Sequence, residues 1–218
     1  MSQWRATARF QQAFSAFVVF TFCGWSCMNA TENGLPPLGN HLKLNTSNKG
    51  KLEEFQRLFA KYGITLDAQE TDLPEIDADP VTVVVHKASQ LQEGVIAEDT
   101  SLNIEGANVG INVRWLLENL PNHIGTKAEW RTLLAYKKGG LVYVFEGRVN
   151  GTIVQPRGTG GFGFDPFFLP DNAQQTLAES KPDSVNARAK AVEALVNGTP
   201  VAIFPPRASW TGPWQERH

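Results

Sequence analysis

Hydrophobic residues recur with two different periods between residues 41 and 198, which predicts strands and helices. Alternating or continuous apolar runs predict strands at 41–46, 64–66, 95–97, 141–149 and 152–155. Apolar residues at helical spacing predict helices at 51–62, 112–120, 126–137 and 184–197. Strands and helices alternate first and paired strands come late, which predicts an α/β fold with a mixed sheet.

Local turn chemistry marks several of these boundaries. Thr126 and Glu129 form a capping-box pattern at the start of the helix predicted at 126–137. Asn150-Gly151 separates the last two strand-like runs and is typical of a hairpin turn. Gly198 follows the last helical pattern and ends it.

Residues 80–93 carry conflicting local signals. Asp79-Pro80 is typical of a helix start, with an N-cap followed by proline in the first turn. The β-branched run 81–85 favours a strand, but the apolar stripe that continues to Ala88 and Leu91 has helical spacing. We choose a helix.

Composition divides the chain into three regions. Residues 1–40 form an N-terminal extension, residues 41–198 form the folded domain, and residues 199–218 form a tail that we expect to be irregular. Arg5 and Arg9 precede the uncharged run 13–27, which has the outline of a secretory signal and is short for a membrane span. The alternative, which we favour, is that translation starts at Met28 and the protein is cytoplasmic rather than exported.

Charge and cysteine usage exclude several classes of protein. The formal net charge of the 218 residues is -2, so no global basic field draws the chain to a nucleic-acid polymer. Both cysteines, Cys23 and Cys27, precede the predicted domain, which excludes a disulfide scaffold there. The four histidines show no metal-ligand spacing, so a zinc site is not expected.

A polar segment follows the first predicted strand and opens the first predicted helix. In Thr46-Ser47-Asn48-Lys49-Gly50-Lys51, Thr46 and Asn48 can donate hydrogen bonds and Lys51 adds a positive charge. Free backbone N–H groups at a helix N-terminus favour anions, so this segment suits a phosphate chain. Simple capping of the helix by Ser47 or Asn48 is the alternative.

Two adjacent carboxylates, Glu98 and Asp99, follow the buried run 95–97 directly. We expect them at the carboxyl edge of a sheet, where ligand sites of α/β proteins gather. Carboxylates this close repel each other unless a cation compensates, and Mg²⁺ is the natural partner. Glu75 is a third candidate ligand. A solvated turn is the alternative.

A glycine-rich loop, Gly158–Gly163, precedes Asp165-Pro166. Its spacing matches a dinucleotide-binding motif, but the prolines at 166 and 170 prevent a helix from following, so we reject that interpretation. We expect instead that the loop brings Phe162 and Asp165 to a pocket, where the ring stacks on a base and the carboxylate reads it. Near the last helix, Lys181 and Arg188 either point at the same nucleotide or form a solvated basic face with Lys190.

Taken in order, these segments resemble the inosine triphosphate pyrophosphatase family over about residues 42–197. The segments that carry the resemblance are Thr46-Ser47-Asn48 with Lys51, Asp72-Leu73-Pro74-Glu75, His86-Lys87-Ala88, Glu98-Asp99-Thr100-Ser101-Leu102 and Gly161-Phe162-Gly163-Phe164-Asp165-Pro166. The resemblance implies an elongated two-lobed α/β fold, a long mixed sheet with flanking helices, an active site in the cleft between lobes, and a homodimer.

The resemblance also implies roles for individual residues. Mg²⁺ would be held by Glu75, Glu98 or Asp99, and Asp99, Glu98 and Lys51 would be catalytic, with Asp99 activating water. The residues expected to bind substrate are Thr46, Asn48, Lys51, Lys87, Ser101, Phe162, Asp165, Lys181 and Arg188. The expected reaction releases pyrophosphate from non-standard purine triphosphates such as ITP, dITP and XTP.

Two departures from the family pattern affect substrate positioning. The family ends its last motif with Ser-His-Arg, whereas this chain has Asn186-Ala187-Arg188, so the histidine that helps to read the base is absent. A Pro-Gly pair common after the acidic segment is replaced by Val109-Gly110-Ile111-Asn112. Two alternatives therefore stay open: the same chemistry on a different base, and a nucleotide-binding protein that has lost catalysis.

Overall fold

A computed structural model of the chain describes Leu35, residues 38–107 and residues 117–215. The strands are β1 (His41–Asn45), β2 (Thr65–Gln69), β3 (Val95–Ile104), β4 (Lys127–Lys138), β5 (Leu141–Ile153), β6 (Phe168–Pro170) and β7 (Ala202–Phe204). The helices are α1 (Lys49–Ala60), α2 (Pro80–Gln90) and α4 (Ala187–Val196), with short 3-10 turns η1 (Leu120–His123), η2 (Asp165–Phe167) and η3 (Asp183–Val185).

The strands form one mixed sheet, with the order β2-β1-β3-β4-β5-β6 and with β7 also paired to β5. Among the described strands, β1 is parallel to its neighbours β2 and β3, and the other pairs are antiparallel. The α/β fold with a long mixed sheet and flanking helices, predicted from the sequence, is therefore confirmed.

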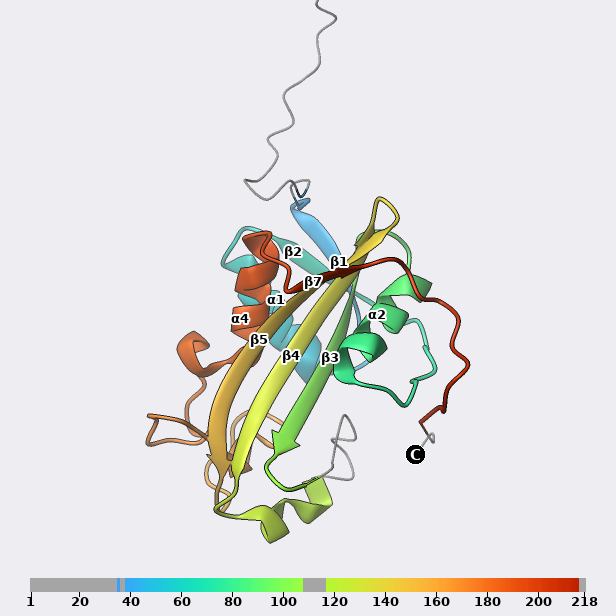
Figure 1. Cartoon of the computed structure of the whole chain (residues 1–218). Coiled ribbons are helices and arrows are strands. Elements are labelled where there is room, and N and C mark those ends of the chain that lie inside the picture. Colours follow the sequence, from blue (N-terminus) through green and yellow to red (C-terminus); the bar gives the residue numbers. More distant parts are fainter. Residues whose placement is uncertain (1–34, 36–37, 108–116, 216–218) are drawn as a thin grey trace, which may run out of the picture.

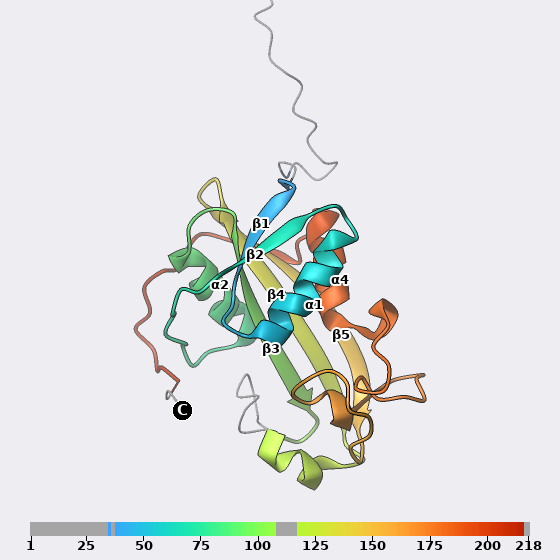
Figure 2. The same cartoon turned by 180° about the vertical axis from the view of Figure 1, so that it is seen from behind.

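Helices cover both faces of the sheet. On one face, called here the α1/α4 face, both helices pack on Leu44, Ile96, Leu134 and Phe145 (Figure 2). On the other, the α2 face, α2 packs on alternate residues of β3 to β5, such as Ala97 (Figure 1). Because successive side chains of a strand point to opposite faces, each central strand contributes to both layers of core.

The segment predicted as a helix at 126–137 is the strand β4, so that prediction was wrong. β4 is paired along its whole length, to β3 on one side and to β5 on the other. Its residues are buried on both faces, which blurs the alternation expected of a strand. The backbone hydrogen bonds to two neighbours outweigh the local capping pattern of Thr126 and Glu129.

The hairpin predicted at Asn150-Gly151 was also wrong, because β5 runs through both residues. The turn lies instead at Gly139-Gly140, between β4 and β5, where both glycines have positive φ of 57° and 76°. Gly151 has a different role: a Cβ there would lie 2.5 Å from the carbonyl oxygen of Leu169, so glycine allows β6 to approach β5.

Other boundaries differ in smaller ways. The predicted irregular tail contains β7, which pairs with β5, and α4 begins at Ala187 after a 3-10 turn rather than at residue 184. Of the helix predicted at 112–120, residues 117–119 are helical, and 112–116 lie outside the described residues, as does the Val109–Asn112 departure. The helix chosen for 80–93 is α2, capped by the Asp79 side chain.

Candidate active site

The acidic pair lies where β1 ends and β3 continues. β1 pairs with β3 only from Lys43–Asn45 to Val95–Ala97, whereas β3 extends to Ile104. Glu98 and Asp99 therefore lie inside β3, whereas the sequence suggested that they follow its end. They come directly after the last residue of β3 that pairs with β1. Beyond Ala97, none of the described strands pairs with this edge of β3.

Glu98 points to the α1/α4 face. Its carboxylate accepts a hydrogen bond from Lys51 Nζ at 2.7 Å and another from the hydroxyl of Thr100. Burial alone would raise the pKa of Glu98, but the charges of Lys51 and Arg188 together with these hydrogen bonds lower it below the ordinary value. Glu98 is thus an ionised, fully paired carboxylate.

Asp99 points to the α2 face. Its Oδ1 lies 3.1 Å from Lys87 Nζ, which also contacts Glu75 Oε1 at 2.6 Å. Burial raises the pKa of Asp99 to about 6, helped by the charge of Glu98 and opposed by Lys87. Asp99 Oδ2 is buried and has no hydrogen-bond partner among the described residues, and neither has Ser101 Oγ two residues further along the same face. Both oxygens are closed off from solvent, and the described side chains leave their hydrogen-bonding capacity unused.

Lys87 is held between two carboxylates. Burial opposes its positive charge, but Asp99 and Glu75 outweigh that effect and raise its pKa above the ordinary value. The lysine comes from α2, Asp99 from β3 and Glu75 from the loop before α2. The structure therefore brings three of the predicted site residues together on the α2 face.

The polar segment 46–51 opens α1 as expected. Asn48 caps the helix, because its side-chain oxygen accepts from the backbone N–H of Lys51 at 3.0 Å. Thr46 Oγ1 accepts from the backbone N–H of Asn48 at 3.2 Å. The capping interpretation of this segment is therefore confirmed, and Lys51 extends to Glu98, whereas phosphate binding by the segment stays a prediction.

Phe162 lies against the start of α1. A Cβ placed on Gly50 would be 3.0 Å from the Phe162 ring, so the glycine allows this contact. The backbone N–H of Phe162 donates to Asp165 Oδ2 at 2.9 Å, which fixes the loop. The ring also lies near two cations, with Arg188 Cζ 4.8 Å and Lys181 Nζ 5.1 Å from its centroid.

A buried network of charges joins the remaining predicted residues. Lys181 Nζ donates to Asp165 Oδ2 at 2.6 Å. Glu54, on α1, accepts from Arg188 at 3.0 Å and from the Asn186 amide at 2.6 Å, and lies 3.5 Å from Lys181 Nζ. Arg188 Nε is buried and has no hydrogen-bond partner in the described part of the chain, so the guanidinium keeps a donor for a ligand.

Sequence reasoning missed Glu54, Asn186 and Trp130. Glu54 lies one turn after Lys51 on α1, so the i, i+3 spacing could have identified it. Asn186 caps α4 and bonds to Glu54. Trp130, whose ring lies 5.1 Å from Arg188 Cζ, was hidden because its segment was predicted as a helix.

The predicted metal ligands do not gather at one point. Glu75 and Asp99 share Lys87, whereas Glu98 lies on the opposite face of the sheet. Among the described residues, no group of three or more His, Cys, Asp or Glu side chains is arranged to hold a metal ion. Protein side chains on the α2 face can therefore supply one or two oxygen ligands.

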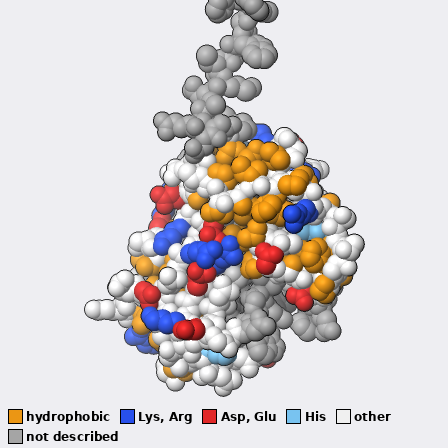
Figure 3. Space-filling view, viewed as in Figure 1, with side chains coloured by type: hydrophobic (Ala, Val, Ile, Leu, Met, Phe, Trp, Pro, Cys, Tyr) orange, Lys and Arg blue, Asp and Glu red, His pale blue; other side chains and the backbone are white. Residues whose placement is uncertain are grey.

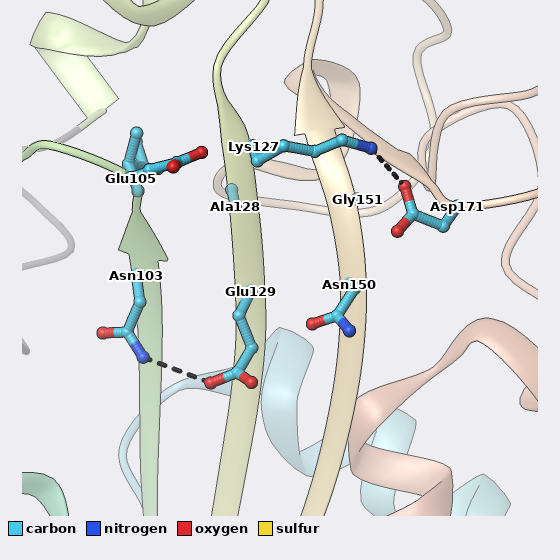
Figure 4. Close-up of a pocket in the computed structure, with 9 residues that line it drawn as sticks. Asn103, Glu105, Lys127, Ala128, Glu129, Asn150, Gly151 and Asp171 are labelled. Carbon is cyan, nitrogen blue, oxygen red and sulfur yellow. Dashed lines mark hydrogen bonds and ion pairs between the residues drawn. The ribbon is translucent and has the colours of Figure 1, made fainter.

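A separate cavity of about 490 Å³ lies further along β3 to β5 on the α2 face (Figure 4). Four of its polar side chains form two pairs: Lys127 with Asp171 at 2.8 Å, and Asn103 with Glu129 at 3.4 Å. Charged side chains gather on this part of the face, while hydrophobic ones cover the part near β7 (Figure 3). We assign the cavity no ligand.

In the part of the chain that the structure describes, no helix is long and apolar enough to cross a membrane.

Comparison with known proteins places these features in a family. The model of the Ham1 family matches residues 42–198. An inosine triphosphate pyrophosphatase of Batrachochytrium dendrobatidis is 34% identical over 167 residues, covering 69% of this chain and 87% of that protein. A dITP/XTP pyrophosphatase of Thermococcus kodakarensis is 31% identical over 172 residues, covering 70% and 93%.

A crystal structure of a nucleoside-triphosphatase, also described as a dITP/XTP pyrophosphatase, from Mycobacterium abscessus is 25% identical. It aligns with a TM-score of 0.48 and covers 72% of this chain and 98% of that chain. The family model spans well over half of the 218 residues, and relatives above 30% identity span more than two thirds, so the chain belongs to the Ham1 family.

Proposed function

We propose that this chain hydrolyses nucleoside triphosphates to a monophosphate and pyrophosphate, with Mg²⁺ and with a preference for non-standard purines such as ITP, dITP and XTP. Relatives that cover most of the chain are named inosine triphosphate or dITP/XTP pyrophosphatases. The observation that carries the proposal is the buried Asp99, with one oxygen that no described residue contacts by a hydrogen bond and the other bonded to Lys87.

The base would lie on the α1/α4 face. Phe162 offers a ring for stacking, and Arg188 and Lys181 offer donors to a purine carbonyl. Glu54 and Asp165 hold both cations in place. The triphosphate would then run from this face, past Lys51 at the start of α1, across the open edge of β3 towards Lys87.

The fit of Mg²⁺ rests on Asp99 Oδ2, a buried oxygen without a hydrogen-bond partner among residues 38–107 and 117–215, and on Glu75, which shares Lys87 with Asp99. Mg²⁺ prefers oxygen ligands and keeps open positions for phosphates and water, so one or two carboxylates suffice. When bound, the ion would neutralise phosphate charge. The protein would supply Asp99, which orients or deprotonates the water that attacks the α-phosphorus, and Lys51 and Lys87, which offset charge on the leaving pyrophosphate.

The Asp99→Asn variant tests the catalytic assignment. We expect loss of turnover by at least about 100-fold, because a general base contributes roughly that much, with nucleotide binding still detectable. Asp171→Asn is the matched control, because Asp171 is an exposed carboxylate on the same face that pairs with Lys127 and lies outside the proposed site. If Asp99→Asn kept near-normal pyrophosphate release, the role of Asp99 would be wrong.

A different base preference is the second candidate function, and Ala187 favours it. The family's histidine position is occupied here by a fully buried alanine, packed in the apolar cluster that contains Trp130 and Leu102. This side chain lacks any group that could read a base. A panel of nucleotides in a pyrophosphate-release assay separates the candidates, since a preference for standard triphosphates would favour the second.

A further inference from the structure

The C-terminal tail lies outside the family match, which ends at residue 198, yet it contacts the loop that carries Glu75. After β7 the tail crosses the α2 face and runs along α2 (Figure 1). Residues 207–215 are called here the strap. The strap first contacts the C-terminal end of α2, where the backbone N–H of Arg207 donates to Ser89 Oγ at 2.7 Å.

The strap next contacts the middle of α2. The indole ring of Trp214 meets the His86 imidazole edge to face, with centroids 5.8 Å apart and planes at 73°. His86 is buried and precedes Lys87, the lysine that contacts Glu75 and Asp99. The strap thus lies against the helix turn that presents this lysine.

The strap finally pairs with the loop before α2. Trp214 and Ile76 form an antiparallel β-bridge. The backbone N–H of Gln215 donates to the carbonyl of Glu75 at 2.9 Å, and the backbone N–H of Asp77 donates to the carbonyl of Pro213 at 3.0 Å. The Gln215 side chain adds a hydrogen bond to the carbonyl of Ile76 at 3.0 Å.

These bonds act on a stretch without regular secondary structure between β2 and α2. The loop is tied to β1 at its start, where Asn45 and Thr71 exchange two hydrogen bonds, and Asp79 caps α2 at its end. Between these points the strap contacts the backbone of Glu75, Ile76 and Asp77. These contacts hold the backbone from the carbonyl of Glu75 to Asp77, next to the point from which the Glu75 side chain reaches Lys87.

We propose that the strap is a positioning element that holds Glu75 beside Lys87. It thereby sets the Mg²⁺ concentration that the enzyme needs. This inference rests on the proposed function of Glu75. Groups that orient metal ligands without touching the metal change its affinity by about 10–100-fold when they are lost. A strap that only sealed the core would instead change stability and leave metal dependence as it was.

The test compares a chain that ends at Thr211 with a chain that ends at Gln215, which keeps every strap contact named above. We expect the shorter chain to need about tenfold more Mg²⁺ for half-maximal rate, with the nucleotide KM at saturating Mg²⁺ within about twofold. Mn²⁺ binding in the presence of a non-hydrolysable triphosphate, followed by electron paramagnetic resonance, should weaken in parallel. Amide exchange of residues 72–79 should become faster.

Full-length Gln215→Pro is the second variant, because proline removes the N–H that donates to Glu75 and leaves the chain length intact. It decides the question if the shorter chain fails to fold. Glu75→Gln separates the metal-ligand role of Glu75 from the positioning role of the strap. If Glu75→Gln weakens Mn²⁺ binding but the strap variants leave it unchanged, the positioning role is wrong. If Glu75→Gln itself has no effect, the metal-ligand role of Glu75 fails and the strap's role with it.

Discussion

Glu98 and Asp99 are adjacent in β3, yet their carboxylates lie on opposite faces of the central sheet, one paired with Lys51 and the other with Lys87. The pair therefore does not act as a single two-carboxylate clamp. Glu98 belongs to the face that carries Phe162 and Arg188, and Asp99 belongs to the face that carries Glu75. A substrate that contacts both must cross the edge of β3 that β1 leaves open.

Asp99→Asn should stabilise the fold above pH 6 even as it abolishes turnover. Burial raises the pKa of Asp99 to about 6, so the folded state binds this proton more tightly than the unfolded state, and ionisation costs stability as the pH rises to 6. Removing the charge should add about 1–3 kcal/mol at pH 8. Urea unfolding in EDTA should show the gain shrinking between pH 6 and pH 4. A variant less stable than wild type at pH 8 would contradict this.

Glu54→Gln should weaken substrate binding more than catalysis. The variant keeps the shape of Glu54 but removes the charge that holds Arg188 and Lys181, and hydrogen bonds to charged groups are worth about 1.5–3 kcal/mol. We expect the nucleotide KM to rise about tenfold or more, with a smaller change in kcat. Glu53→Gln, at the exposed neighbouring position, serves as the control. Equal effects of both variants would remove Glu54 from the site.

Phe162→Ala should raise the nucleotide KM by about tenfold, because stacking of a base on an aromatic ring is worth about 1–3 kcal/mol. Phe162→Trp keeps an aromatic surface and should retain most of the affinity. Steady-state kinetics on one triphosphate measure both variants. If alanine and tryptophan at this position behave alike, the ring does not stack on the base.

Gly147→Ala should destabilise the protein by about 3 kcal/mol or more. A Cβ at this position of β5 would lie 1.9 Å from the carbonyl oxygen of Ala187 and 2.6 Å from the amide nitrogen of Ala191, so α4 would have to move away from the sheet. Because α4 carries Arg188, activity should fall as well. Thermal unfolding measures the loss, and a variant with unchanged stability would show that this close approach is absent.

The sequence singled out Lys51, Lys87, Phe162, Asp165 and Arg188, and the structure places each of them beside another predicted site residue, while their roles stay predictions. Their local patterns, a capped helix start and a glycine loop, depend on a few neighbouring residues. The opposite orientation of Glu98 and Asp99 was not predicted, because the sequence analysis ended the strand at residue 97, where the charged residues begin. β3 continues to Ile104.

The errors in the fold have a common physical cause. The strand β4 depends on pairing with β3 as well as with β5, and β5 continues through Asn150-Gly151 because it pairs there with β4 and β6. The patterns of Thr126 with Glu129 and of Asn150-Gly151 are strong only locally. Gly139-Gly140, the true turn, was a hairpin signal as well. The strap was not predictable, because its contacts with Glu75 join segments more than 100 residues apart.

The most direct test of the proposed activity is product analysis with the purified chain and a panel of triphosphates. With Mg²⁺ present, ITP, dITP and XTP should each yield one pyrophosphate and one monophosphate, at kcat/KM values at least about tenfold above those for ATP and GTP. A tenfold ratio corresponds to about 1.4 kcal/mol of discrimination in the transition state. Release of single phosphates, or tight nucleotide binding with no pyrophosphate from any member of the panel, would contradict the account.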